Sequence, residues 1–360
     1  MMETFPEGRA VVYCQGAFNT PNGKTAHGLV RRTERYQVLS VVDARFDGED
    51  AGLILDGRQN GVKVFAGLPA AVAAASAEGM PATHCVMGLA PDGGRLSPEA
   101  RRDMQTALEL GLNVDSGLHD LLTEDPELVA AAARAGVRIR DIRKTPPRRS
   151  LHFFSGRIEE VASLKVALLG TDSAVGKRTT AWILIDALRA AGCRCELIGT
   201  GQTAWMQGVR YGLIMDALIN DFVAGEIEHA VLSAWDEVRP DVIVIEGQGS
   251  LMNPAYPGGL EILAAGRPDV VVLQHAPARK EYDGFPGYPI HPLKTQIQAV
   301  ELLSSRPVAA VTLNREGLDE AGIQAAIEAV TRETGLPAME VLYHRPEPLL
   351  AALKPYLRKV

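Results

Sequence analysis

The chain has 360 residues, of which 46% are hydrophobic, and its formal net charge at pH 7 is -7. Because single cores rarely grow beyond about 250 residues, this length predicts two domains. The acidic balance argues against nucleic-acid or anionic-membrane partners. Neither the start, MMETFPEGRA, nor any later stretch has the pattern of a signal peptide or a membrane helix. We therefore expect a cytoplasmic homo-oligomer that binds a small-molecule substrate, with no nucleic-acid or membrane partner.

The first half of the sequence alternates β-rich runs with helical stretches, which predicts a parallel α/β sheet. Helices are predicted at 68–78, which is rich in Ala, and at 97–110, which opens with Ser-Pro-Glu. The segment 16–25 contains Gly-Lys-Thr, but six residues separate its glycines, whereas a phosphate-binding loop has four. This half also lacks the G-x-G-x-x-G fingerprint of NAD binding. Strands are predicted at 11–15, 38–43, 62–65, 83–88, 112–115 and 137–142.

The segment 144–149, K-T-P-P-R-R, interrupts this alternation. Adjacent prolines cannot continue a helix or a central strand. We therefore place a domain boundary here, with a first domain at 1–147 and a second at 148–360. A new α/β series follows in the second domain. Its strands are predicted at 164–169, 194–199, 241–246, 270–274 and 308–313, and a final helix near 347–357.

The segment 170–181, GTDSAVGKRTTA, follows a predicted strand and has the features of a phosphate-binding loop. A strand, a Gly-rich loop and a helix in this order direct backbone N–H groups at an anion. The register G-T-D-S-x-V-G-K resembles the loop of dethiobiotin synthetase. A nucleotide hydrolase has Ser or Thr after its Lys, whereas Arg178 stands there in this chain. The predicted cofactor-binding residues are Gly170, Thr171, Asp172, Ser173, Ala174, Val175, Gly176, Lys177, Arg178 and Thr179.

A second strand-end motif is Glu246-Gly-Gln-Gly-Ser, which follows the apolar strand predicted at 241–246. A carboxylate at a strand end that faces a phosphate loop can bind Mg²⁺ or accept a proton. The structural alternative is a solvated carboxylate at a strand terminus. The two glycines beside Glu246 favour close approach of the backbone to a ligand.

Two further loops are expected at the same edge, since ligands of open α/β sheets bind outside the carboxyl ends of the strands. The first is 199–205, GTGQTAW, and the second begins at 274 with QHAPARKEYDGF. The second concentrates His, Arg, Lys, Tyr and Asp in a connection too long to be mere linkage, so we interpret it as the substrate loop. The predicted substrate-binding residues are Gln202, Gln248, Ser250, Arg279 and Lys280.

Through several long motifs, the chain resembles a bacterial family long known only as a domain of unknown function. Some members of that family are described as D-glutamate N-acetyltransferases. The resemblance covers nearly the whole chain and implies a Rossmann-like parallel sheet in the first domain, a P-loop NTPase-like parallel sheet in the second, and acetyl-CoA as the acetyl donor. The motifs that carry it are GTDSAVGKRTTA, GTGQTAW, IEGQGSLMNPAYP, LQHAPARKEYDGFPGYPIHPL and, in the first half, VDSGLHDLL.

Residue chemistry is compatible with coenzyme A as the ligand of the loop. Its phosphates can be bound by N–H groups and Lys177 without cleavage, and Arg178 adds a positive group where a hydrolase holds Mg²⁺. We therefore expect acetyl transfer to the amine of an acidic amino acid, with no metal. The expected base is Glu246, and His275 and Asp172 are the alternatives.

Two other functions fit the same residues. One is an ATP- and Mg²⁺-dependent ligase or kinase related to dethiobiotin synthetase, with Lys177 on the β- and γ-phosphates and Glu246 and Thr179 on Mg²⁺. The other is a ligand sensor that uses the loop without turnover. Arg178 favours the acetyltransferase over the ligase, because one residue turns a helix by about 100° and Thr179 does not simply replace a hydroxyl at 178.

Overall fold

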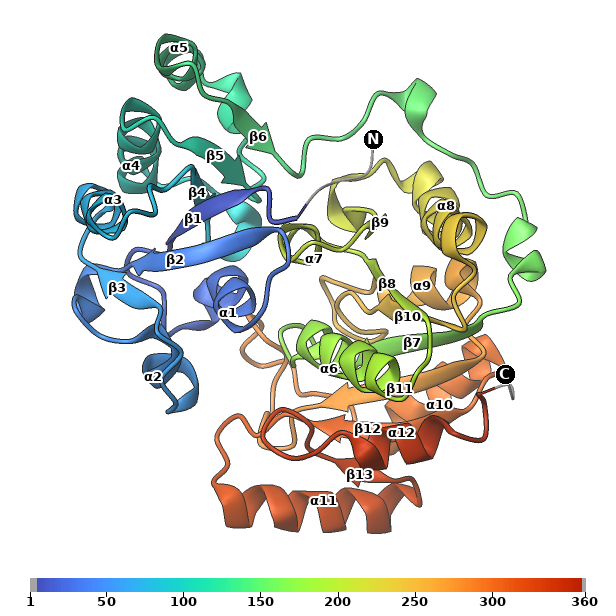
Figure 1. Ribbon diagram of the computed structural model, residues 1–360. Coiled ribbons are helices and arrows are strands. Elements are labelled where there is room, and N and C mark those ends of the chain that lie inside the picture. Colours follow the sequence, from blue (N-terminus) through green and yellow to red (C-terminus); the bar gives the residue numbers. More distant parts are fainter. Residues whose placement is uncertain (1–4, 358–360) are drawn as a thin grey trace. The chain divides into compact units, whose positions relative to one another are not determined.

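The computed structural model describes residues 5–357, so the outermost ends of the two predicted domains, 1–4 and 358–360, lie outside the described residues. The chain forms two compact units (Figure 1). Unit 1 runs to Thr145 and also contains Gln202–Gly208, while unit 2 comprises Pro146–Gly201 and the chain from Val209 onward. Nothing in the sequence pattern indicates that a segment from the second strand series belongs to unit 1.

Unit 1 is built on a six-stranded sheet in the order β3-β2-β1-β4-β5-β6, and every pairing is parallel. This strand order is that of dinucleotide-binding Rossmann folds. All six strands predicted for the first half are confirmed within a few residues. They are β1 (Gly8–Tyr13), β2 (Tyr36–Val42), β3 (Lys63–Phe65), β4 (His84–Met87), β5 (Asn113–Ser116) and β6 (Ile139–Asp141).

Helices cover both faces of the unit 1 sheet (Figure 1). On β1, Val11 and Tyr13 pack against one helical layer and Ala10 and Val12 against the other. Burial on both faces explains why the strands read as continuous apolar runs. One layer consists of α3 (Leu68–Ala77), α4 (Pro98–Glu109) and α5 (Pro126–Ala135), and the other of α1 (Lys24–Arg31), α2 (Ala51–Asp56) and α7 (Gln202–Met206).

Unit 2 is built on a seven-stranded, all-parallel sheet in the order β13-β12-β11-β7-β10-β8-β9. The five strands predicted for this half are confirmed, whereas the two-residue strands β9 and β13 are too short to leave a sequence pattern. The strands are β7 (Leu164–Gly170), β8 (Cys195–Gly199), β9 (Tyr211–Gly212), β10 (Val242–Glu246), β11 (Val270–His275), β12 (Val308–Leu313) and β13 (Ala338–Met339).

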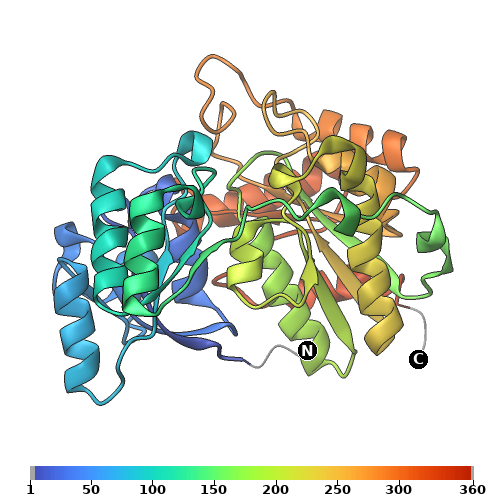
Figure 2. The ribbon, with the colours of Figure 1, turned by 90° about the horizontal axis from the view of Figure 1, so that it is seen from above.

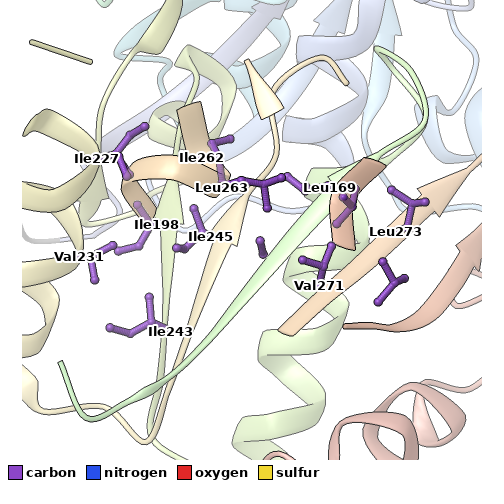
Figure 3. Packing of buried hydrophobic residues seen from close by; sticks show 14 of the residues in the cluster. Leu169, Ile198, Ile227, Val231, Ile243, Ile245, Ile262, Leu263, Val271 and Leu273 are labelled. Carbon is purple, nitrogen blue, oxygen red and sulfur yellow. The ribbon is translucent and has the colours of Figure 1, made fainter. Parts of the chain in front are cut away.

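The core of unit 2 lies on both sides of this sheet. Ile243 and Ile245 of β10 belong to the hydrophobic cluster shown in Figure 3, together with Ile227 and Ile262. This face is covered by α8 (Asn220–Val238), α9 (Gly259–Gly266), α10 (Leu293–Ser304) and α11 (Glu320–Thr334). The other face is covered by α6 (Lys177–Ala190) and α12 (Glu347–Leu353).

The last helix is shorter than predicted, because α12 ends at Leu353 and the chain continues in turns. In the described part of the chain, no helix has the length and apolar content needed to cross a membrane.

Candidate functional site

Three loops of unit 2 meet at the carboxyl edge of its sheet. In the sheet, β7 lies between β11 and β10, so the loops that follow these three parallel strands are neighbours at one edge. They are the loop after β7 at 171–176, the loop after β10 at 247–258 and the loop after β11 at 276–292. In Figure 2 the last of these, in orange, extends well beyond the strands.

The loop after β7 has the backbone shape of a phosphate cradle. Gly176, with φ of 101°, and Ala174, with φ of 52°, both adopt left-handed conformations, which turn the chain sharply into α6. The first helical backbone bond of α6 is donated by Thr180 N to Gly176 O. The N–H groups of the preceding turn have no carbonyl within the helix to bond, and they give this end its affinity for anions.

The Lys177 side chain is buried and crosses from its own loop to the loop after β10. Its Nζ donates to the carbonyl oxygens of Asp172, at 2.7 Å, and Gly249, at 2.8 Å. A Cβ added at Gly170 would come within 2.9 Å of the lysine Cδ, and one added at Gly247 within 3.0 Å. Glycine at both positions leaves room for the lysine stem, and at 247 it also avoids the Leu168 carbonyl oxygen, which an added Cβ would approach to 2.5 Å.

Glu246 is buried at the end of β10, beside the start of α6. Its Oε1 lies 3.6 Å from the Arg178 guanidinium, and its Oε2 accepts a 3.0 Å hydrogen bond from Thr200 N. Burial raises the pKa of this carboxyl above its usual range, and the nearby charge of Arg178 opposes that rise. Arg178, one of the predicted cofactor-binding residues, therefore lies directly beside the candidate base.

Asp172 joins all three loops through its buried carboxylate. Its Oδ1 accepts hydrogen bonds from Ser173 N, at 2.7 Å, and Asn253 Nδ2, at 2.8 Å. Its Oδ2 accepts from Arg279, at 2.8 Å, and from Asp283 N, at 2.8 Å. Because its oxygens already take four donors, Asp172 is better suited to anchor the loops than to accept a substrate proton.

The two cations of the predicted substrate loop have different surroundings. Arg279 donates to Asp172, to the Ser173 carbonyl and to Glu316, so two carboxylates compensate its charge. The Lys280 side chain is exposed. Lys280 is therefore better placed than Arg279 to meet an anionic ligand.

His275 ends β11 next to the phosphate-binding loop. Its Nδ1 lies 2.9 Å from Thr171 Oγ1. Burial, together with the charges of Arg279 and Lys280, lowers the pKa of this imidazole to about 4. At neutral pH His275 is uncharged.

The remaining predicted substrate residues fall in both units. Gln248 donates to the Thr200 carbonyl at 3.0 Å, and Ser250 Oγ accepts from Asn253 N at 3.0 Å, so both shape the loop after β10. Gln202 belongs to unit 1, where its Oε1 accepts from Arg143 at 3.0 Å. The carboxyl edge of unit 2 therefore brings together all the predicted site residues except Gln202.

Two polar residues at this edge were not among the predicted site residues, although Gln274 begins the predicted substrate loop. Gln274 Oε1 accepts 2.6 Å hydrogen bonds from Thr180 and Thr312, and Asn314 Nδ2 donates to the Val175 carbonyl at 2.8 Å. Gln274 and Asn314 lie at or just after strand ends, and that position is the sequence feature from which they could have been found. Within residues 5–357, no group of three or more His, Cys, Asp or Glu side chains is arranged to hold a metal ion.

The fold and this edge define a P-loop domain joined to a Rossmann-like domain. The chain belongs to the DUF1611 family, a family of unknown function: residues 152–350 match its P-loop domain and residues 44–145 its Rossmann-like domain. A crystal structure of a DUF1611 family protein from Anabaena variabilis is 30% identical, with a TM-score of 0.88 over 97% of this chain and 100% of that one.

Two relatives carry the name D-glutamate N-acetyltransferase. The protein from Tritonibacter scottomollicae is 31% identical over 274 residues, which cover 74% of this chain and 80% of the relative. The protein from a Pseudoalteromonas species is 31% identical over 251 residues, which cover 69% of this chain and 71% of the relative.

Proposed function

We propose that the protein transfers the acetyl group of acetyl-CoA to the amine of an acidic amino acid, D-glutamate. The names of the two relatives support this reaction. The observation that carries it is the contact between Arg178 and Glu246. A guanidinium here suits a loop that recognises phosphate, because it supplies a fixed positive charge where a nucleotide hydrolase would place a metal-binding hydroxyl.

The donor is held through its phosphates by residues 170–179. The N–H groups of the loop and the first turn of α6 bind the pyrophosphate, and Lys177 and Arg178 compensate its charge. To reach a phosphate, the Lys177 ammonium exchanges its bonds with the Asp172 and Gly249 carbonyls for ion-paired hydrogen bonds to phosphate oxygens. No phosphoanhydride bond is broken in this use of the loop.

Glu246 is the general base of the proposed reaction. It takes a proton from the substrate ammonium, and the neutral amine then attacks the thioester carbonyl carbon. The C–N bond forms, the C–S bond breaks, and the excess proton on nitrogen passes to the leaving thiolate. A carboxyl with a raised pKa is a stronger base than His275, whose pKa is about 4.

The amino-acid substrate requires a cation for its carboxylates. Lys280 fits this role because it is exposed, whereas the charge of Arg279 is already compensated by Asp172 and Glu316. We assign Gln248 and Ser250 to the wall of the same site, next to Glu246 in the chain. The substrate is thus placed between the loops after β10 and β11.

Mass-spectrometric detection of products tests this function. The purified protein is incubated with acetyl-CoA and a panel of D- and L-amino acids, and Glu246→Gln serves as the matched control. The expected product is N-acetyl-D-glutamate, formed by the wild type and much more slowly by the variant. A panel in which no amino acid is acetylated would refute the proposal.

A further inference from the structure

Three aromatic side chains form a cluster on the loops after β10 and β11. The Tyr256 and Phe285 rings meet edge to face with centroids 6.4 Å apart, and the Phe285 and Tyr288 rings do so at 6.3 Å. Tyr256 is 50% exposed and Tyr288 57% exposed. Grouped aromatic rings that stay open to solvent are characteristic of binding surfaces.

The backbone around Tyr256 is held by a set of hydrogen bonds. Asn253 Oδ1 accepts from Ala255 N, at 2.9 Å, and from Tyr256 N, at 3.0 Å. Ser250 N donates to the Tyr256 carbonyl at 3.0 Å. Asn253 also donates to Asp172 of the phosphate-binding loop. The backbone of Tyr256 is therefore linked to that loop through Asn253.

The other two rings are fixed in the same manner. Phe285 N donates to Tyr282 O, Tyr288 N to Phe285 O, and Tyr282 N to Tyr288 O. Asp283, within this turn, donates its N–H to Asp172 Oδ2 at 2.8 Å. The buried Asp172 carboxylate therefore anchors both loops that carry the aromatic cluster.

The cluster also adjoins the lysine of the phosphate-binding loop. The Gly249 carbonyl accepts from Lys177 Nζ at 2.8 Å. On its other side, Gly249 packs so closely on Tyr256 that an added Cβ would collide with the Tyr256 carbonyl oxygen. Gly249 therefore contacts both the Lys177 ammonium, through its carbonyl, and the backbone of Tyr256, which carries the first ring of the cluster.

We infer that Tyr256 and Tyr288, supported by Phe285, bind the adenine ring of coenzyme A while residues 170–179 bind its phosphates. This inference rests on the proposed function for the identity of the donor. Adenine is planar with apolar faces that stack on aromatic rings. Glutamate has no ring and two carboxylates, so it gains little from this surface. The loops that carry the aromatic cluster are bonded to Asp172 and Lys177 of the phosphate-binding loop, which favours one ligand that has both a planar ring and phosphates.

Calorimetric titration tests the inference without relying on turnover. The probes are coenzyme A, adenosine 3′,5′-bisphosphate, which keeps the adenine, and 4′-phosphopantetheine, which lacks it. Tyr256→Ala and Tyr288→Ala should each weaken the affinity for coenzyme A and for adenosine 3′,5′-bisphosphate by roughly 5- to 150-fold, the range for loss of one stacked base. Affinity for 4′-phosphopantetheine should stay unchanged.

Two controls separate stacking from other effects. Tyr256→Phe and Tyr288→Phe keep the ring and should retain wild-type affinity for coenzyme A. Leu302→Ala removes an 82% exposed apolar side chain from α10 and should change nothing. Phe variants that bind as weakly as the Ala variants would overturn the stacking role.

The outcomes also distinguish this inference from the proposed function. Ala variants that bind coenzyme A like the wild type would overturn the adenine site, even if acetyl transfer is observed. Selective loss of coenzyme A binding in the Ala variants, with no acetyl transfer by the wild type, would support the adenine site and refute the transferase.

Discussion

The guanidinium of Arg178 lies 3.6 Å from the carboxylate of Glu246, at the point where the phosphate-binding loop enters α6. Arg178 is next to Lys177 in the chain, and the charges of both residues lower the pKa of Glu246. If these two residues bind the donor phosphates, as we propose, donor binding is coupled to the protonation of Glu246.

Replacing Arg178 with Thr should affect both roles. Loss of a charge-assisted hydrogen bond of about 1.5–3 kcal/mol should raise KM for acetyl-CoA roughly 10- to 150-fold. Because Arg178 lowers the pKa of Glu246, its removal should also move the acid limb of the rate profile to higher pH. Steady-state kinetics as a function of pH measures both effects. Arg178→Lys should keep the limb close to its wild-type position, and an unchanged limb in Arg178→Thr would show that the pair is not coupled.

Glu246→Gln should remove the base while keeping the shape of the side chain. We expect kcat to fall by about 10²- to 10⁴-fold, the usual contribution of general-base catalysis. Affinity for coenzyme A should not weaken, because the neutral amide no longer competes with phosphate for the charge of Arg178. The wild-type kcat/KM should decline at low pH with an apparent pKa above that of an ordinary glutamate, since burial raises the pKa of this carboxyl. A variant with wild-type kcat would eliminate Glu246 as the base.

Asp172→Asn should destabilise the protein far more than Glu316→Gln, although both carboxylates pair with Arg279. Asp172 is fully buried and holds three loops, so removing its charge should cost about 3–5 kcal/mol. Glu316 is exposed, and its loss should cost about 1 kcal/mol or less. Urea unfolding at neutral pH gives both free energies, and equal losses would contradict the anchoring role of Asp172.

His275 should make the stability of the protein depend on pH between 4 and 6.5. Because its pKa is lowered from 6.5 to about 4 in the fold, the unfolded chain binds the proton more readily over this range. The stabilisation is fully present above pH 6.5 and decreases as the pH falls. Below pH 4 the total loss of unfolding free energy is about 3 kcal/mol. His275→Asn keeps an amide that can bond Thr171 but cannot titrate, so its unfolding free energy should vary less with pH. If the unfolding free energies of the wild type and His275→Asn vary with pH in parallel, the pKa of His275 is not lowered by the fold.

The strands and the phosphate-binding loop could be predicted because their causes are local. Burial on both sheet faces makes β10 a continuous apolar run, and Gly176-Lys177 at the end of a loop carries its own conformational requirement. The role of Asp172 could not be predicted, since its partners Asn253, Arg279 and Asp283 are 81, 107 and 111 residues away in the chain. The sequence alone does not show whether a charged residue on one loop is paired with an opposite charge on another loop.

The same limit applies to the glycines at the strand ends. The glycines beside Glu246 suggested close approach to a ligand, whereas Gly247, like Gly170, also makes room for the Lys177 side chain. That steric reason depends on how β7 and β10 pair in parallel, which no local pattern specifies. The grouping of Gln202–Gly208 with unit 1 is likewise a tertiary property.

The loop at 170–179 is proposed to bind the phosphates of acetyl-CoA without cleaving a phosphoanhydride. The most direct measurement is the initial rate of coenzyme A release from acetyl-CoA and D-glutamate, with EDTA present and no nucleotide added. Phosphate release from ATP and Mg²⁺ is followed in parallel. We predict full acetyl transfer under EDTA, a large loss in Lys177→Ala, and no ATP turnover. Strict dependence on ATP and Mg²⁺, with no acetyl transfer from acetyl-CoA, would contradict the claim.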